Sequence, residues 1–145
     1  MKFLKSFEPL SLLVLRLSLA LIFVYHGYPK LVHPNDQMRE FFTSHGFPAY
    51  FVGLAGIIEC FGALLLASGL FTRPAALVLV GEMAVAIAKV HGARGLISVK
   101  DYEFPLALAA GCLVLATVGA GVVSGDHVFF GEGGKSRRVA KSSRD

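Results

Sequence analysis

The chain has 145 residues, a length that suits a single domain. Its composition is 54% hydrophobic and 17% charged. Soluble domains carry about 25% charged residues, so this composition excludes an ordinary soluble domain and predicts a membrane protein. The net charge of +4 comes largely from the C-terminal tail, which argues against a nucleic-acid-binding protein. The two cysteines lie inside apolar segments without CxxC spacing, so neither a disulfide framework nor a zinc site is expected.

Four apolar segments predict an all-α, integral membrane four-helix bundle, because about 20 residues at ~1.5 Å rise cross a bilayer core. The predicted spans are residues 10–28, 48–69, 75–90 and 102–123 of a membrane domain that covers residues 1–130. The basic segment 131–145 is expected to be a disordered cytoplasmic tail.

The first span carries a polar face. At ~100° per residue, Arg16, Phe23, Gly27 and Lys30 fall on one side of the helix. After this span, a polar and aromatic stretch predicts a short interfacial helix between spans 1 and 2. One side of that helix would hold Met38, Phe41, Phe42 and His45; an ordinary connecting loop is the alternative.

Span 2 carries Glu59 near its middle and is lined by small residues that favour close helix packing, namely Gly53, Gly56, Gly62 and Ala63. Span 3 carries Glu82 at a similar depth. Span 4 has a heptad-like stripe that is expected to face the bundle, formed by Glu103, Ala107, Ala110, Val114, Thr117 and Gly121.

The basic residues predict the orientation of the chain. With four spans both termini lie on the same side, and that side holds eight Lys and Arg residues against five on the other. The positive-inside rule therefore predicts cytoplasmic termini in a multi-pass protein.

Charged and polar residues within or beside the spans form the candidate ligand-binding cluster: Arg16, His26, Lys30, Glu59, Glu82, Lys89, Tyr102 and Glu103. Rise arithmetic groups Arg16 with Glu59 and Glu82 in a deeper tier. An outer tier would pair Glu103 with Lys89 or Lys30, beside His26 and Tyr102.

Charges buried in a membrane are costly unless they are paired, and two explanations account for these. One is a network of ion pairs that fixes helix register. The other is a polar pocket for a ligand or a proton relay. His26 has its own structural explanation, a hydrogen bond to a backbone carbonyl at the helix end. The spacing of the histidines matches no metal site, and no Rossmann, P-loop, haem-attachment or Ser-His-Asp pattern occurs, so no catalytic residue is assigned.

Several strings resemble the DoxX family of small bacterial inner-membrane proteins, over roughly residues 10–130. They are LRLSLALIFVYHGYPKL, AGIIECFGALLLASGLFTRPAAL, GEMAVAIAKVHG and DYEFPLALAAGCLVLATVGAG. The resemblance implies a four-helix protein of the bacterial inner (plasma) membrane. It also implies a redox association, since a related protein is the DoxD subunit of a thiosulfate:quinone oxidoreductase.

On this basis we expect an accessory or quinone-interacting subunit of a membrane redox system, with quinone as the cofactor and a redox subunit or a second copy as the partner. Phe23, Tyr25 and Phe51 are expected to pack the quinone ring. Two alternatives stay open, a small-solute transporter or channel and a non-catalytic assembly or partner-binding protein. Whether the chain is itself an enzyme is not determined by any motif.

Overall fold

A computed structural model describes residues 2–92 and 99–131. Every regular element within these residues is a helix, which confirms the all-α prediction. The elements in chain order are α1 (Lys2–Lys5), α2 (Glu8–Val32), α3 (Asp36–Ser44), α4 (Phe51–Ser68), α5 (Thr72–Ala86), the π-helical η1 (Ile87–His91), α6 (Val99–Val118) and α7 (Gly125–Phe130).

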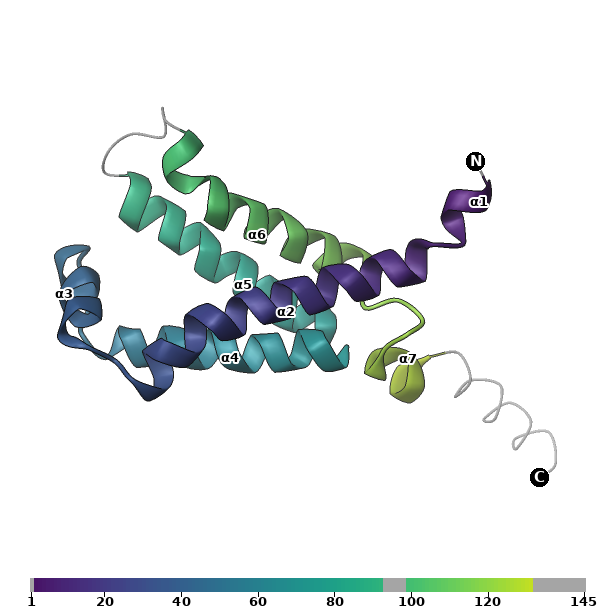
Figure 1. Ribbon diagram of the computed structural model, residues 1–145, viewed down its shortest axis with the longest axis horizontal. Coiled ribbons are helices and arrows are strands. Elements are labelled where there is room, and N and C mark those ends of the chain that lie inside the picture. Colours follow the sequence, from purple (N-terminus) through teal and green to yellow (C-terminus); the bar gives the residue numbers. More distant parts are fainter. Residues whose placement is uncertain (1, 93–98, 132–145) are drawn as a thin grey trace, which may run out of the picture.

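The long helices pack as two pairs. Helix α2 lies along α4, α5 lies along α6, and contacts between α4 and α5 join the two pairs (Figure 1). Helix α3 lies at one end of the molecule, whereas α1 and α7 lie near the opposite end (Figure 1). The buried core between the pairs includes Leu66 of α4, Leu79 of α5 and Leu115 of α6, all fully buried.

Among the described residues, three helices are long and apolar enough to cross a membrane: α2, α4 and α6. They correspond to the predicted spans at residues 10–28, 48–69 and 102–123. The third predicted span, residues 75–90, falls on α5 and η1; α5 has 15 residues before the π-helical turn begins. The tail predicted at residues 131–145 lies outside the described residues except for Gly131.

The polar face predicted for the first span is largely buried. Arg16, Phe23 and Gly27 of α2 are buried against the other helices, and Lys30 is partly buried. The face that these residues share at helical spacing is therefore the side of α2 that packs against the other helices.

Helix α6 differs from the prediction in its end and in its buried face. It stops at Val118 rather than continuing to residue 123, because Gly119 and Gly121 adopt φ values of 96° and 80° that break a right-handed helix. The predicted stripe from Glu103 to Thr117 is exposed, and the buried residues are instead Leu108, Cys112 and Leu115. The side chains of α6 are apolar on most sides of the helix, so its sequence carries little information on which side faces the protein.

Candidate functional site

The site begins where α2 crosses α4 at two glycines. A Cβ atom added to Gly27 would lie 2.7 Å from the Cβ of Glu59, and one added to Gly56 would lie 2.8 Å from the backbone nitrogen of Leu31. Both distances are too short for real side chains, so the two backbones can approach this closely only through glycine. The crossing places residues one turn beyond each glycine, Lys30 and Glu59, against one another.

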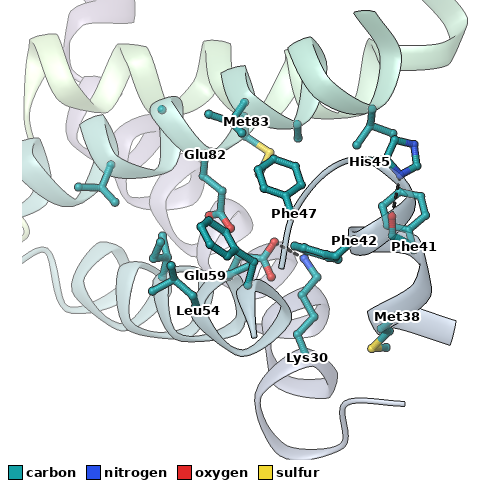
Figure 2. A pocket seen from close by; sticks show the side chains of 18 of the residues that line it. Lys30, Met38, Phe41, Phe42, His45, Phe47, Leu54, Glu59, Glu82 and Met83 are labelled. Atoms are coloured by element: carbon teal, nitrogen blue, oxygen red, sulfur yellow. Dashed lines mark hydrogen bonds and ion pairs between the residues drawn. The ribbon is translucent and has the colours of Figure 1, made fainter. Parts of the chain in front are cut away.

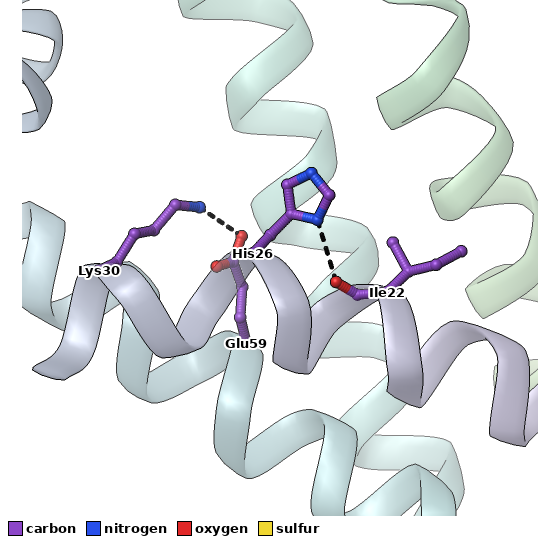
Figure 3. Close-up of polar contacts among 4 residues, drawn as sticks. All are labelled: Ile22, His26, Lys30 and Glu59. Atoms are coloured by element: carbon purple, nitrogen blue, oxygen red, sulfur yellow. Dashed lines mark hydrogen bonds and ion pairs between the residues drawn. The ribbon is translucent and has the colours of Figure 1, made fainter. Parts of the chain in front are cut away.

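Lys30 and Glu59 form an ion pair. The Lys30 Nζ donates to Glu59 Oε1 over 2.6 Å (Figure 3). The Glu59 side chain is 4% exposed and that of Lys30 is 23% exposed. The pair therefore offsets the cost of burying the Glu59 charge while its cationic end stays partly accessible.

A second carboxylate comes from the neighbouring helix. Glu82 of α5 directs its carboxylate toward Glu59 (Figure 2). Oε2 of Glu59 and Oε2 of Glu82 are both buried, and neither has a hydrogen-bond partner in the part of the chain that the structure describes. Lys30 thus pairs with Glu59 alone, and each of the two carboxyl groups presents an unsatisfied oxygen.

These three side chains line a cavity of about 720 Å³ between α3, α4, α5 and the end of α2. We call this cavity the carboxylate pocket. Most of its lining residues are apolar, and they include the aromatic and methionine side chains of Met38, Phe41, Phe42, Phe47, Phe51 and Met83. Several of these are labelled in Figure 2. Its volume lies within the ~300–1,000 Å³ of small-molecule sites, and its mainly apolar lining with a few polar groups is typical of them.

Helix α3 supplies one wall of the pocket. The helix begins at Asn35, whose side chain accepts a hydrogen bond from the Met38 backbone N–H at 2.8 Å. The side predicted to hold Met38, Phe41, Phe42 and His45 is the side that lines the pocket, so this grouping is confirmed. After α3 the chain turns at Gly46, with φ +81°, and brings Phe47 over the cavity.

Arg16 lies in a different cluster. Its guanidinium donates to four backbone carbonyls, those of Leu66 at 2.9 Å, Ala67 at 3.3 Å, Ala120 at 2.7 Å and Val123 at 2.9 Å. Leu66 and Ala67 lie in the last turn of α4, where the helix dipole favours a cation. The predicted deeper tier, with Arg16 beside Glu59 and Glu82, is therefore wrong.

Asp126 of α7 completes this second cluster, and the sequence did not reveal it. Its carboxylate accepts hydrogen bonds from the backbone N–H groups of Phe71 at 2.7 Å and Thr72 at 3.0 Å, where α5 begins. Its own backbone N–H donates to the Gly69 carbonyl at 2.7 Å. We call Arg16, Gly69 and Asp126, with their backbone partners, the Arg16 cluster.

The remaining predicted site residues lie away from the pocket. His26 is exposed, lies near the Ile22 carbonyl at 3.0 Å (Figure 3) and packs against Phe104 of α6 at 5.3 Å, which agrees with its structural explanation. Lys89 and Glu103 are exposed, and Tyr102 is partly buried; none of the three lines the pocket. The predicted outer tier is wrong for Lys30, because Lys30 pairs with Glu59.

The aromatic lining was predicted only in part. Of the rings expected to pack a ligand, Phe51 lines the pocket, while Phe23 is buried in the core and Tyr25 is exposed. Phe47 and Met83 were missed. Met83 directly follows Glu82, and Phe47 precedes the second predicted span, so neither position by itself indicates a pocket. Both side chains become lining residues because α3 and α5 approach one another around the cavity.

The family model for DoxX matches residues 11–92, more than half of the chain and the whole segment that builds the carboxylate pocket. The chain belongs to the DoxX family. Together with the three candidate spans, this membership makes it a membrane protein. No solved structure matches the chain.

Relatives of this DoxX protein include two bacterial membrane proteins. An uncharacterized protein of Haemophilus influenzae is 37% identical over 88% of this chain and 96% of its own length. The inner membrane protein YphA of Escherichia coli is 28% identical over 83% of this chain and 91% of its own length. An uncharacterized membrane protein of Mycobacterium tuberculosis is 35% identical over 54% of this chain and 50% of its own.

Proposed function

We propose that this DoxX protein is an accessory, quinone-interacting subunit of a membrane redox system, and that the carboxylate pocket holds the quinone ring. One observation carries the proposal. A cavity of about 720 Å³ with aromatic and methionine side chains in its lining contains the Lys30–Glu59 ion pair and the carboxyl group of Glu82. Glu59 and Glu82 each have one buried oxygen without a hydrogen-bond partner among the described residues. A buried polar atom without a partner is costly, so these oxygens favour a ligand that supplies one.

The residues fit an aromatic ligand with polar substituents. Phe42, Phe47 and Phe51 offer ring faces and edges against which a flat ring packs. Met38 and Met83 adapt to an irregular outline because the thioether side chain is flexible and polarizable. A bound quinone would supply two-electron redox chemistry, while this chain binds and orients its ring. Cys60 and Cys112 are free thiols on different helices, so the proposal assigns electron transfer to a partner subunit or a second copy.

The proposal includes a four-span arrangement. Helix α5 runs directly into η1, and their 15 and 5 residues rise about 30 Å, the thickness of the hydrocarbon core. With cytoplasmic termini, Lys30 and α3 lie toward the outer face of the membrane. Helix α3 would then lie at the interface, and a lipid-soluble ligand would reach the pocket from the bilayer.

Quinone content and ligand-dependent melting test this function. The protein would be purified in mild detergent, extracted with organic solvent and examined by a redox difference spectrum. A naphthoquinone such as menadione should raise the melting temperature of the wild type. Phe47→Ala should weaken that binding by about tenfold, since ring–ring contacts contribute roughly 0.5–1.5 kcal/mol beyond burial of their area.

Phe61→Ala is the matched control. Phe61 is a ring of α4 that is 62% exposed and does not line the pocket, so its loss should leave menadione binding unchanged. Absence of quinone from the extract, together with no thermal shift by menadione or menadiol, would contradict the proposal.

A further inference from the structure

The polar groups of the carboxylate pocket are mainly acceptors. Oε2 of Glu59 and Oε2 of Glu82 are buried and unpartnered among the described residues, and ionised carboxylates accept hydrogen bonds without donating them. The buried acceptors therefore call for donors from the occupant. Glu59 is 3% exposed, which leaves water little access to its free oxygen.

The available donors are already engaged or lie at the rim. Lys30 Nζ donates to Glu59 Oε1 over 2.6 Å. The other lining residues with side-chain donors are Asn35 and Gln37, exposed at the start of α3, and His45 at its end, whose Nδ1 lies 2.7 Å from the Phe41 carbonyl oxygen. Lys30 keeps two further N–H groups. One ammonium thus balances two carboxyl groups, an environment that disfavours anionic ligands.

We infer that the carboxylate pocket selects the reduced, hydroxylated form of its ligand. The inference rests on the function proposed above, under which the ligand is of the quinone type and the selected form is the hydroquinone. It concerns the preference of the site between two redox forms of one molecule and adds no electron-transfer step.

Hydrogen bonding explains the preference. A ring hydroxyl facing Glu82 or Glu59 donates a charge-assisted hydrogen bond, which is short and roughly twice as strong as a neutral one. The same oxygen can also accept from a free N–H of Lys30. The carbonyl of the oxidised form can also accept from Lys30, but it leaves the buried carboxylate oxygen without a donor, so the reduced form should bind at least about tenfold more tightly.

Such selectivity has an electrochemical consequence. A site that binds the reduced form more tightly makes reduction of its ligand more favourable. The midpoint potential of the bound pair therefore rises above that of the free pair, by about 30 mV for each tenfold of preference in a two-electron couple.

The test compares menadione with menadiol on the purified full-length protein under anaerobic conditions, by equilibrium dialysis in detergent. We expect wild-type protein to bind menadiol at least about tenfold more tightly, and bound menadione to titrate at a raised potential. Glu82→Gln should bring the two affinities within about threefold, because a neutral amide can donate to a carbonyl as well as accept from a hydroxyl.

Glu103→Gln is the matched control, because Glu103 is an exposed carboxylate outside the pocket. It should keep the wild-type preference for menadiol. The wild-type ratio of affinities is decisive by itself and does not depend on any variant folding. Equal affinities, or tighter binding of menadione, overturn the inference while the proposed function stands. Binding of neither form overturns the proposed function and the inference with it.

Discussion

The two buried polar clusters of this membrane protein differ in how completely their hydrogen-bonding groups are satisfied. In the Arg16 cluster, the guanidinium reaches four carbonyls, and both carboxylate oxygens of Asp126 accept backbone N–H groups. In the carboxylate pocket, Lys30 reaches one oxygen of Glu59, while Glu59 and Glu82 each keep a buried oxygen without a partner in the described chain.

The partners differ as well. The Arg16 cluster bonds to backbone at the ends of α4 and α6 and the start of α5, so it joins elements that are far apart in the sequence. The carboxylate pocket bonds side chain to side chain and borders a cavity of about 720 Å³. A polar cluster whose charged groups are all hydrogen-bonded to backbone serves the fold, whereas one whose carboxyl groups lack partners beside a cavity is suited to a ligand.

The largest expected effect comes from a substitution that disrupts the Arg16 cluster. Arg16→Met removes all four hydrogen bonds and takes the guanidinium donor away from the buried Ala120 carbonyl. Hydrogen bonds to charged groups contribute roughly 1.5–3 kcal/mol each, so we expect a loss of about 4 kcal/mol or more in unfolding free energy, measured by SDS titration in mixed micelles. Arg39→Met is the control, since Arg39 is half exposed, and it should melt like wild type. Wild-type stability of Arg16→Met would contradict a structural role.

A double-mutant cycle tests the ion pair of the pocket. Lys30→Met should cost about 2–3 kcal/mol, because it leaves the buried Glu59 carboxylate unpaired, and Glu59→Gln should cost about 2 kcal/mol, because it leaves the partly buried Lys30 without its counter-ion. The double variant should cost less than either single variant, since no unpaired charge remains, yet it should not recover ligand binding. A double variant whose two effects simply add would show that the residues do not interact.

The glycine crossing connects stability with the pocket. Gly27→Ala places a methyl group 2.7 Å from the Glu59 Cβ, so α2 and α4 must separate. We expect a loss of about 2 kcal/mol and a weaker Lys30–Glu59 contact. Gly53→Ala is the matched control, because nothing lies within 4 Å of the added Cβ. Higher helix propensity should make it slightly more stable than wild type. Equal melting of the two variants would refute close packing at Gly27.

Asp126→Ala tests whether the Arg16 cluster contributes to stability without contributing to ligand binding. It removes the carboxylate that accepts from the Phe71 and Thr72 N–H groups at the start of α5. A lost N-terminal cap costs about 1–2 kcal/mol, which thermal unfolding would detect. Menadiol affinity should stay at the wild-type value, because Asp126 lies outside the pocket. An affinity change as large as that of Glu82→Gln would mean that the two clusters are coupled.

The smallest expected effect is a gain of stability. Glu82→Met replaces a carboxyl group that holds a buried, unsatisfied oxygen by an apolar side chain of similar size. We expect stability to rise by up to about 1 kcal/mol while menadiol binding is lost, the exchange of stability for function that binding sites often show. Destabilisation by this substitution would indicate that Glu82 supports the fold.

Local patterns located much of this architecture. Apolar length identified the segments that form α2, α4 and α6. Helical spacing placed Arg16, Phe23 and Gly27 on one face of α2, which the structure shows to be buried. The side of α3 that holds Phe41 and Phe42 was also identified. The prediction of the buried face of α6 was wrong. Lipid is as apolar as the protein interior, so a largely apolar helix shows no hydrophobic periodicity that would mark its buried side.

Hydrogen-bond partners that are remote in the sequence could not be predicted from local patterns. Rise arithmetic placed Arg16 at the depth of two carboxylates, but its partners are carbonyls 50 to 107 residues away. Every residue has a backbone carbonyl, so the carbonyls near Arg16 are determined by the points where α4 and α6 end. Carbonyls at the end of a helix are the ones available to accept hydrogen bonds from a side chain. Gly119 and Gly121 set one of those points through positive φ values.

By itself, the sequence determined a helical membrane protein that must bury several charges, since apolar length and charge content are properties of the chain alone. Tertiary structure decided which charges meet. The approach of α2 to α4 at Gly27 and Gly56 gave Glu59 its lysine, and the position of α5 gave Glu82 no partner within the described residues. Hydrogen bonds depend on distances of a few tenths of an ångström, and only packing sets distances between residues that are remote in sequence.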